Sequence, residues 1–188
     1  MSSTTLAYRL GDADAMCRYP VIIGGATILG YVSRWHRNWN AESSAGTHLV
    51  GRPPVGKPGG EWAAAYLVGE YAEGRITPIP AQATSSEAAH GPAPLLDPRM
   101  PDTPTNRTRA LAVLAILAEY EWTPRSGFPG ADNLMLLHCN LCGTTVPRFW
   151  SHLRGRNSQP PSPYRHRGCL SADEVRRRVP AYGPSPAS

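Results

Sequence analysis

The sequence contains no hydrophobic run long enough to cross a membrane. Its longest uninterrupted apolar stretch, residues 110–118, is far shorter than the roughly 20 residues that a bilayer requires. The first residues also lack the basic start and apolar core of a signal peptide. These absences predict a cytoplasmic protein without a membrane partner. In such a reducing compartment, clustered cysteines bind metal more often than they form disulfides.

Phenylalanine, lysine and charge in general are also scarce. The 188 residues include two phenylalanines, one lysine and only 18% charged side chains, beside 20 prolines and 18 glycines. This composition predicts short folded units joined by irregular segments. We expect an α+β protein made of a β-rich unit with one helix over residues 1–74, a proline-rich flexible linker over 75–103, a helix plus a helical zinc-finger-like module over 104–180, and a disordered tail over 181–188.

The β-rich unit is predicted from residues 19–50. Two β-branched runs are divided by Gly24 and Gly25, a pattern typical of a hairpin with a tight turn. A second reversal at residues 36–38 and a further strand at 47–50 would complete a small meander. The stretch EWAAAYLVGEYAEG then predicts a helix that covers the sheet and ends at Gly74.

A second helix is predicted over residues 104–122. Thr103 is a suitable N-cap, and Pro104 would occupy the first helical position, where its missing N–H does no harm. Apolar residues occur on most faces of this helix, which predicts that it is buried and suggests a homodimer interface through residues 105–122.

A third helix is predicted over residues 172–179, near the end of the chain. Ser171 and Glu174 form a capping box, and Leu170 and Val175 occupy the two positions of a hydrophobic staple. Pro180 would end the helix.

Residues 138–169 hold three of the four cysteines and three of the six histidines. Cys139 and Cys142 have the spacing with which a tight knuckle presents two thiolates to one tetrahedral ion, and Gly143 suits such a turn. His152 lies on a helix expected over residues 147–156. The set we favour is Cys139, Cys142, His152 and Cys169, and the alternative uses His166 in place of Cys169. Soft or borderline ligands without a carboxylate predict a closed structural zinc site.

This segment resembles zinc fingers of the CCHC and CCHH types over residues 138–171. The resemblance is one of plan, since a knuckle is followed by a helix that supplies a ligand, and it implies zinc as the cofactor. The gap of nine residues between Cys142 and His152 differs from the roughly twelve of the CCHH pattern. The segment also resembles His-metal nucleases in placing His152 and Asn157 after a knuckle. However, no Asp or Glu lies between Cys142 and Cys169 to hold a catalytic cation, so we do not predict an enzyme.

Positive charge is concentrated around the cysteines. Residues 139–178 contain eight arginines and two carboxylates, for a net charge of +6, whereas residues 1–138 carry −1. This asymmetry is typical of a protein that binds a polyanion. We therefore expect an accessory or regulatory nucleic-acid-binding protein of a bacterium or phage, with DNA favoured over RNA. The expected contacts are Arg148, Trp150, Arg154, Arg156, Arg165 and Arg167.

Two alternatives remain open at this stage. Trp150 could stack on a base beside Arg154, or it could cover a small core that has few other aromatic residues. Likewise, the zinc module could be an adaptor that binds another protein and no nucleic acid.

Overall fold

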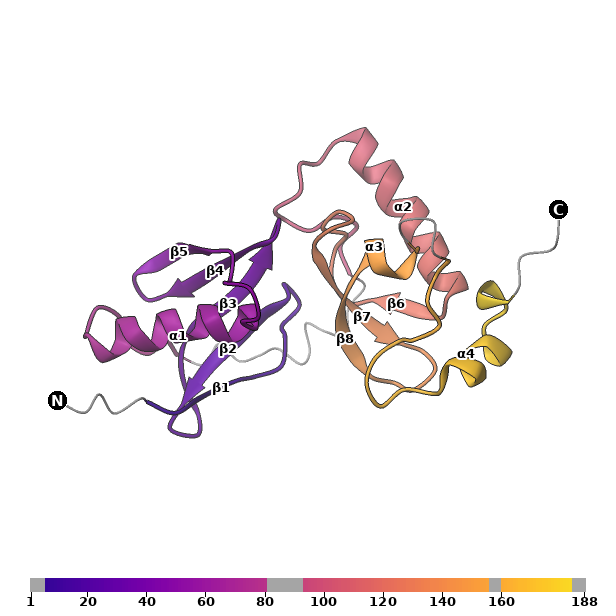
Figure 1. Cartoon of the computed structure of the whole chain (residues 1–188). Helices are drawn as coiled ribbons and strands as arrows, with labels where there is room; N and C mark the ends of the chain where they lie inside the picture. The colour runs from indigo at the N-terminus through magenta and orange to yellow at the C-terminus, as the bar shows by residue number, and fades with distance from the viewer. Residues whose placement is uncertain (1–5, 81–92, 156–159, 184–188) are drawn as a thin grey trace. The chain divides into compact units, whose positions relative to one another are not determined.

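The computed structural model describes residues 6–80, 93–155 and 160–183 (Figure 1). The chain divides into two compact units, Met1–Ala88 and Ala89–Ser188, which we describe one at a time. Each unit combines an antiparallel sheet with helices, so the α+β prediction is confirmed. Within the described ranges, no helix is both long enough and apolar enough to cross a membrane.

The N-terminal unit is a five-stranded antiparallel meander with a helix across one face (Figure 1). The strands follow one another in chain order: β1 (Tyr8–Leu10), β2 (Arg18–Ile23), β3 (Thr27–Trp35), β4 (Asn38–Ser43) and β5 (Gly46–Gly51). The helix is α1 (Gly59–Ala72). The meander and its covering helix are as predicted, whereas the short β1 was not expected.

Both predicted turns of the meander are present. Gly24 and Gly25 join β2 to β3 with φ values of 53° and 89°, the left-handed conformation that glycine adopts without steric cost. His36 and Arg37 join β3 to β4 with φ values of 46° and 72°, although neither is glycine. The second reversal is therefore formed without a glycine at either turn position.

The core of this unit lies between the sheet and α1. Leu29 and Val32 of β3 are completely buried, and they belong to one cluster with Ala64 and Leu67 of α1. Gly30 allows close packing at this point, because a Cβ added there would lie 2.1 Å from the carbonyl oxygen of Glu42 on the neighbouring strand.

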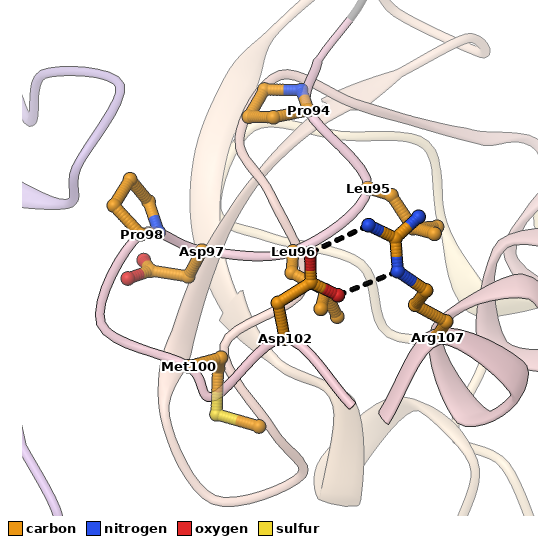
Figure 2. Close-up of a pocket in the computed structure, with 8 residues that line it drawn as sticks. All are labelled: Pro94, Leu95, Leu96, Asp97, Pro98, Met100, Asp102 and Arg107. Atoms are coloured by element: carbon orange, nitrogen blue, oxygen red, sulfur yellow. Dashed lines mark hydrogen bonds and ion pairs between the residues drawn. The ribbon is translucent and has the colours of Figure 1, made fainter. Parts of the chain in front are cut away.

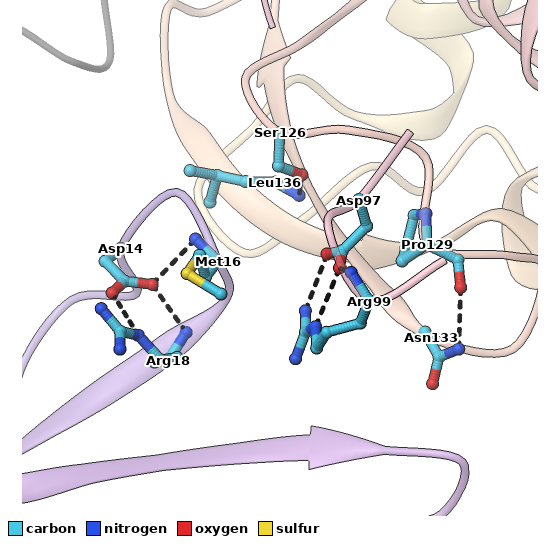
Figure 3. A network of polar contacts seen from close by, with 9 residues as sticks. All are labelled: Asp14, Met16, Arg18, Asp97, Arg99, Ser126, Pro129, Asn133 and Leu136. Carbon is cyan, nitrogen blue, oxygen red and sulfur yellow. Dashed lines mark hydrogen bonds and ion pairs between the residues drawn. The ribbon is translucent and has the colours of Figure 1, made fainter. Parts of the chain in front are cut away.

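A carboxylate organises the loop between β1 and β2. Asp14 accepts hydrogen bonds from the backbone N–H groups of Met16 and Arg18, both at 2.9 Å, and from Nε of Arg18 at 2.8 Å (Figure 3). Arg18 also bonds Glu42 on β4 at 2.9 Å and lies over the ring of Tyr31. The loop is thereby attached to three strands of the sheet.

Both ends of the segment expected to be a linker belong to folded parts. Ile76 is buried in the core of the N-terminal unit, and the N–H of Ile79 donates to the carbonyl of Ile28 at 2.9 Å. In the C-terminal unit, Leu96 forms an isolated bridge with Phe128. The middle of the expected linker, residues 81–92, lies outside the described residues.

The C-terminal unit contains a three-stranded antiparallel sheet in the order β6-β7-β8 (Figure 1). Its elements are α2 (Pro104–Glu119), β6 (Trp122–Pro124), β7 (Leu134–Cys139), β8 (Thr145–Phe149), α3 (Trp150–Leu153), α4 (Ala172–Arg178) and a single 3-10 turn (Pro180–Tyr182). The segment that carries the clustered cysteines is therefore built on a sheet, which differs from the helical module expected from the sequence.

The helix predicted over residues 147–156 is wrong for its first half. Residues 145–149 form β8, which pairs with β7 so that Leu136 lies opposite Pro147. β8 is an edge strand, so the missing N–H of Pro147 removes little sheet hydrogen bonding. Pro147, which was interpreted as the first residue of a helix, therefore lies in an edge strand. Of the described residues in the predicted range, those at 150–153 alone are helical.

Helix α2 begins as predicted but ends earlier and is less buried. The Thr103 side chain accepts a hydrogen bond from the N–H of Asn106 at 3.2 Å, which confirms the N-cap. The helix ends at Glu119, and only one face, formed by Ala110, Val113 and Leu117, is buried. Within the single chain the other faces are not buried, since Leu111 is 59% exposed. The homodimer interface on this helix stays a prediction.

The tail expected to be disordered is partly folded. Tyr182 is buried and packs edge-on against Tyr120, with ring centroids 4.6 Å apart. Val175 and Val179 of the α4 region, both fully buried, complete this small cluster. Residues 184–188 lie outside the described residues.

Polar contacts fix the loops that precede β7 (Figure 3). Asp97 is almost completely buried and forms an ion pair with Arg99 at 2.8 Å. The Asn133 side-chain amide donates to the carbonyl of Pro129 at 2.8 Å, and the Ser126 hydroxyl accepts from the N–H of Leu136 at 2.9 Å. These bonds satisfy buried polar groups and hold β7 in place for the residues that follow it.

Candidate metal centre

The first half of the candidate metal centre is the turn between β7 and β8. Strand β7 ends at Cys139, whose carbonyl accepts hydrogen bonds from the N–H groups of Cys142 at 3.3 Å and Gly143 at 2.8 Å. Gly143 adopts a φ of 79°, as expected for the knuckle predicted from the sequence. The turn brings the side chains of Cys139 and Cys142 to the same side.

The second half is a similar turn just before α4. The N–H of Cys169 donates to the carbonyl of His166 at 3.3 Å, and Gly168 has a φ of 82°. In both halves, the two candidate ligands are three positions apart in the sequence. Each half also contains a glycine with a positive φ. The capped start of α4 follows at once, because the Ser171 hydroxyl accepts from the N–H of Glu174 at 3.3 Å. This confirms the predicted N-cap.

Four ligand atoms from the two turns lie within 4.8 Å of one another. The sulfur atoms of Cys139 and Cys169 are 3.7 Å apart, and Sγ of Cys142 lies 3.2 Å from Nε2 of His166. The cysteines are free thiols, and 3.7 Å is far from the roughly 2.05 Å of a disulfide bond. This arrangement forms a Cys3His group that could hold a metal ion.

The Cys3His group differs from the favoured sequence set at one position. His166 and Cys169, which were treated as alternatives, both belong to it, and His152 does not. His152 lies on α3, where its ring is 5.0 Å from that of Phe149. The equal spacing of Cys139 to Cys142 and of His166 to Cys169 was the signal in the sequence that could have indicated this group.

The hydrogen bond on the other ring nitrogen of His166 prepares this side chain to bind a metal. Nδ1 lies 3.0 Å from the carbonyl oxygen of Arg167. Because a carbonyl can only accept, Nδ1 carries the proton, which leaves the lone pair of Nε2 directed toward Cys142. Metal-ligating histidines are commonly oriented in this way.

The thiols of the group differ in acidity. Burial alone would raise the pKa of Cys142, but hydrogen bonds from the side chain and backbone of Thr144 and from the neighbouring thiols outweigh it and lower this pKa to about 6. Burial and the neighbouring Cys139 and Cys142 raise the pKa of Cys169 to about 11. A bound cation would favour the ionised form of Cys169 at neutral pH.

Several residues expected to contact nucleic acid are not on the surface. Trp150 is only 6% exposed and packs in the core of the C-terminal unit, so the alternative that it covers a core is the correct one. Arg165 is 1% exposed. Arg148 is half-buried, and this burial lowers the pKa of its guanidinium despite the nearby Tyr164 and Tyr182.

Two of the expected contacts do lie at the surface. Arg154 follows α3 and Arg167 lies in the second turn of the metal centre, and both are exposed. Arg156 falls outside the described residues. The exposed basic surface also includes residues that we had not assigned to binding, namely Arg176, Arg177 and Arg178 of α4.

A separate pocket of about 430 Å³ lies beside the start of α2 (Figure 2). It is lined mainly by apolar side chains, including Leu95, Leu96 and Met100. Its charged groups are already paired. Arg107 binds both carboxylate oxygens of Asp102 at 2.5 Å and thereby lowers the pKa of that carboxyl, and Asp97 forms its ion pair with Arg99. The pocket therefore presents no polar group directed at a ligand.

The Cys3His group offers four ligand atoms, which is the number that a closed tetrahedral structural site requires. No protein-family model, no curated protein and no solved structure matches the chain.

Proposed function

We propose that the C-terminal unit is a zinc-stabilised module that binds nucleic acid, and that DNA is its ligand. The observation that carries the proposal is the Cys3His group, because thiolates and imidazole select zinc over magnesium or calcium. Zinc–sulfur bonds of about 2.3 Å around a tetrahedral ion place two sulfurs roughly 3.8 Å apart. The 3.7 Å between Cys139 and Cys169 fits that requirement.

The exposed charge of the same unit supports a polyanionic ligand. Five exposed arginines belong to the C-terminal unit: Arg154, Arg167, Arg176, Arg177 and Arg178. Asp173 and Glu174 form ion pairs with the three arginines of α4, but they offset only two of these charges. The surplus of cations on a rigid, metal-held scaffold is suited to phosphate contacts.

The DNA-binding part is tested by measuring the affinity of the full chain for duplex DNA over a range of salt concentrations. If about five phosphates are contacted, the slope of log affinity against log salt is roughly −4.5. The triple variant Arg154→Gln, Arg167→Gln, Arg177→Gln removes three of these charges, so the slope should fall in magnitude by about 2.7.

A matched variant controls for the loss of net charge. Arg9, Arg37 and Arg52 are exposed in the N-terminal unit, and their replacement by glutamine removes the same charge without altering the proposed surface. Equal effects of the two triple variants, or no binding at low salt, would contradict the proposal.

Duplex RNA in the same assay tests the preference for DNA. Cleavage of the nucleic acid that depends on magnesium would indicate a nuclease.

Protein binding is the second candidate function, and the exposed face of α2 favours it. Leu111 is 59% exposed, and Ala115 and Ala118 on the same face are exposed as well. Such a face could hold a second copy of the chain, as the sequence suggested, or another protein. A monomer–dimer equilibrium that is abolished by Leu111→Glu, together with no affinity for DNA, would favour this adaptor role.

A further inference from the structure

Arg165 is a fully buried arginine next to the candidate metal centre. Only 1% of its surface is exposed, and its guanidinium forms three hydrogen bonds. Nε donates to Sγ of Cys139 at 3.0 Å, and the two terminal nitrogens donate to the carbonyls of Tyr120 at 2.6 Å and Glu121 at 2.5 Å. The guanidinium also lies 4.0 Å above the ring of Trp122. Arg165 therefore joins the metal centre to the end of α2.

The charge of this guanidinium requires an anionic partner. An arginine stays protonated in proteins, and burying its charge is costly unless an opposite charge lies close by. Among the described residues, no carboxylate forms an ion pair with Arg165, and two of its three acceptors are neutral carbonyls. The third is the sulfur of Cys139, which is itself completely buried.

A zinc ion bound by the Cys3His group would make this balance exact. Three thiolates and one neutral imidazole give the zinc centre a net charge of −1. The guanidinium of Arg165 offsets that charge from the buried side of Cys139. Neither charge is well accommodated in the core without the other.

The end of α2 depends on the same contacts. Glu121 directly follows the C-cap of α2 and has a φ of 57°, a conformation that costs a non-glycine residue energy. Its carbonyl accepts hydrogen bonds from Arg165 and from the N–H of Asn140, the latter at 3.1 Å. Because Asn140 lies between Cys139 and Cys142, the metal centre supports Glu121 through two independent bonds.

We propose that Arg165 is a positioning residue of the metal centre, which holds the Cys139 thiolate, neutralises the centre and couples metal binding to the end of α2. The proposal rests on the metal-binding part of the proposed function and is independent of nucleic-acid binding. Loss of the metal would then also affect the end of α2. Without the negative charge of the metal centre, Arg165 would no longer hold the carbonyls of Tyr120 and Glu121.

Cobalt(II) binding by the full chain tests this role, because the sulfur-to-cobalt charge-transfer band reports on the thiolates directly. A hydrogen bond lowers the energy of the sulfur lone pairs, so Arg165→Met should shift the band to longer wavelength. The same substitution should weaken cobalt and zinc binding by about 10- to 100-fold, as is usual for outer-shell partners of metal ligands. Arg109→Met is the matched control, since Arg109 is exposed on α2 and belongs neither to the Cys3His group nor to the proposed nucleic-acid surface. This control should leave both the band and the affinity unchanged.

Hydrogen exchange provides a readout at a distance from the metal. Peptides that cover residues 117–122 should lose protection in Arg165→Met and, to a similar extent, in the wild-type chain after metal removal.

Arg165→Lys keeps the positive charge but lacks the forked guanidinium that reaches the sulfur and both carbonyls. The charge-transfer band of this variant should therefore also shift. This second variant decides the question if Arg165→Met does not fold.

Wild-type affinity and an unshifted band in Arg165→Met, or in Arg165→Lys where the first variant is unfolded, would overturn the proposal. A wild-type chain that binds neither cobalt nor zinc would overturn both this proposal and the zinc site. A shifted band together with no DNA binding would support the role of Arg165 and refute only the nucleic-acid part of the proposed function.

Discussion

Sγ of Cys142 and Nε2 of His166 lie 3.2 Å apart although 24 residues separate them in the chain. Each belongs to a short hydrogen-bonded turn. A metal ion shared by the two turns would close a long loop, and the free energy of metal binding would then contribute directly to folding. The two histidines that follow the first turn, His152 and His166, can be distinguished by experiment on this basis.

His166→Gln should abolish stoichiometric zinc binding, whereas His152→Gln should retain about one zinc per chain. The reason is geometric, because His166 belongs to the Cys3His group and His152 does not. Metal content of the purified variants, measured by mass spectrometry, checks the prediction. Cys17→Ser is a control for cysteine loss, since Cys17 belongs to the N-terminal unit and is not a member of the group. Loss of zinc from His152→Gln alone would contradict this assignment.

Removal of zinc should unfold the C-terminal unit and leave the N-terminal unit folded. Structural zinc sites contribute about 10–16 kcal/mol in zinc-finger peptides, more than a small domain can lose, whereas the N-terminal unit has a separate core. Hydrogen exchange with and without a strong chelator measures the two units in one sample. Protection should disappear from residues 134–139 and persist in residues 27–35. Unchanged protection in both segments would show that the metal is not structural.

The sequence predicted those parts of the fold that depend on local signals. Gly24 and Gly25 indicated a turn because few other residues adopt positive φ, and Thr103 and Ser171 indicated helix starts because their side chains cap free N–H groups. Such features depend on only a few neighbouring residues. The predictions of this turn and of these two helix starts are therefore confirmed by the structure.

Features that depend on distant contacts were not predicted. Pro147 is compatible with both a helix start and an edge strand, and only its pairing opposite Leu136 decides between them. The charge of Arg165 indicated a surface residue, because nothing in the local sequence shows that Cys139 and two helix-end carbonyls accept its hydrogen bonds. The fourth ligand was likewise uncertain until the two turns were brought together.

Gly30→Ala should strongly destabilise the N-terminal unit. The added Cβ would lie 2.1 Å from the carbonyl of Glu42, so the pairing of β3 with β4 has to shift, at a cost typical of overpacking, about 1–3 kcal/mol or more. Gly69→Ala is the matched control, because Gly69 lies within α1 and its added Cβ would meet no atom within 4 Å. This control should stabilise the unit by roughly 0.5–1 kcal/mol. Thermal unfolding of both variants measures the difference, and equal effects would contradict the close approach of the two strands.

Trp150→Ala should destabilise the C-terminal unit by about 3–5 kcal/mol, because the indole is 6% exposed and packs in the same cluster as Leu137 and Leu153. Arg154→Gln, at an exposed position four residues later, should change stability by no more than about 0.5 kcal/mol. Denaturant unfolding followed by hydrogen exchange in the C-terminal unit gives both values.

DNA binding of the two variants, measured at a temperature where both are folded, separates the roles further. Affinity should fall in Arg154→Gln through the loss of a cation, whereas folded Trp150→Phe should bind as the wild type does. If Trp150→Phe instead loses affinity at wild-type stability, the indole contacts the ligand and its buried position in the core is not the binding-competent one.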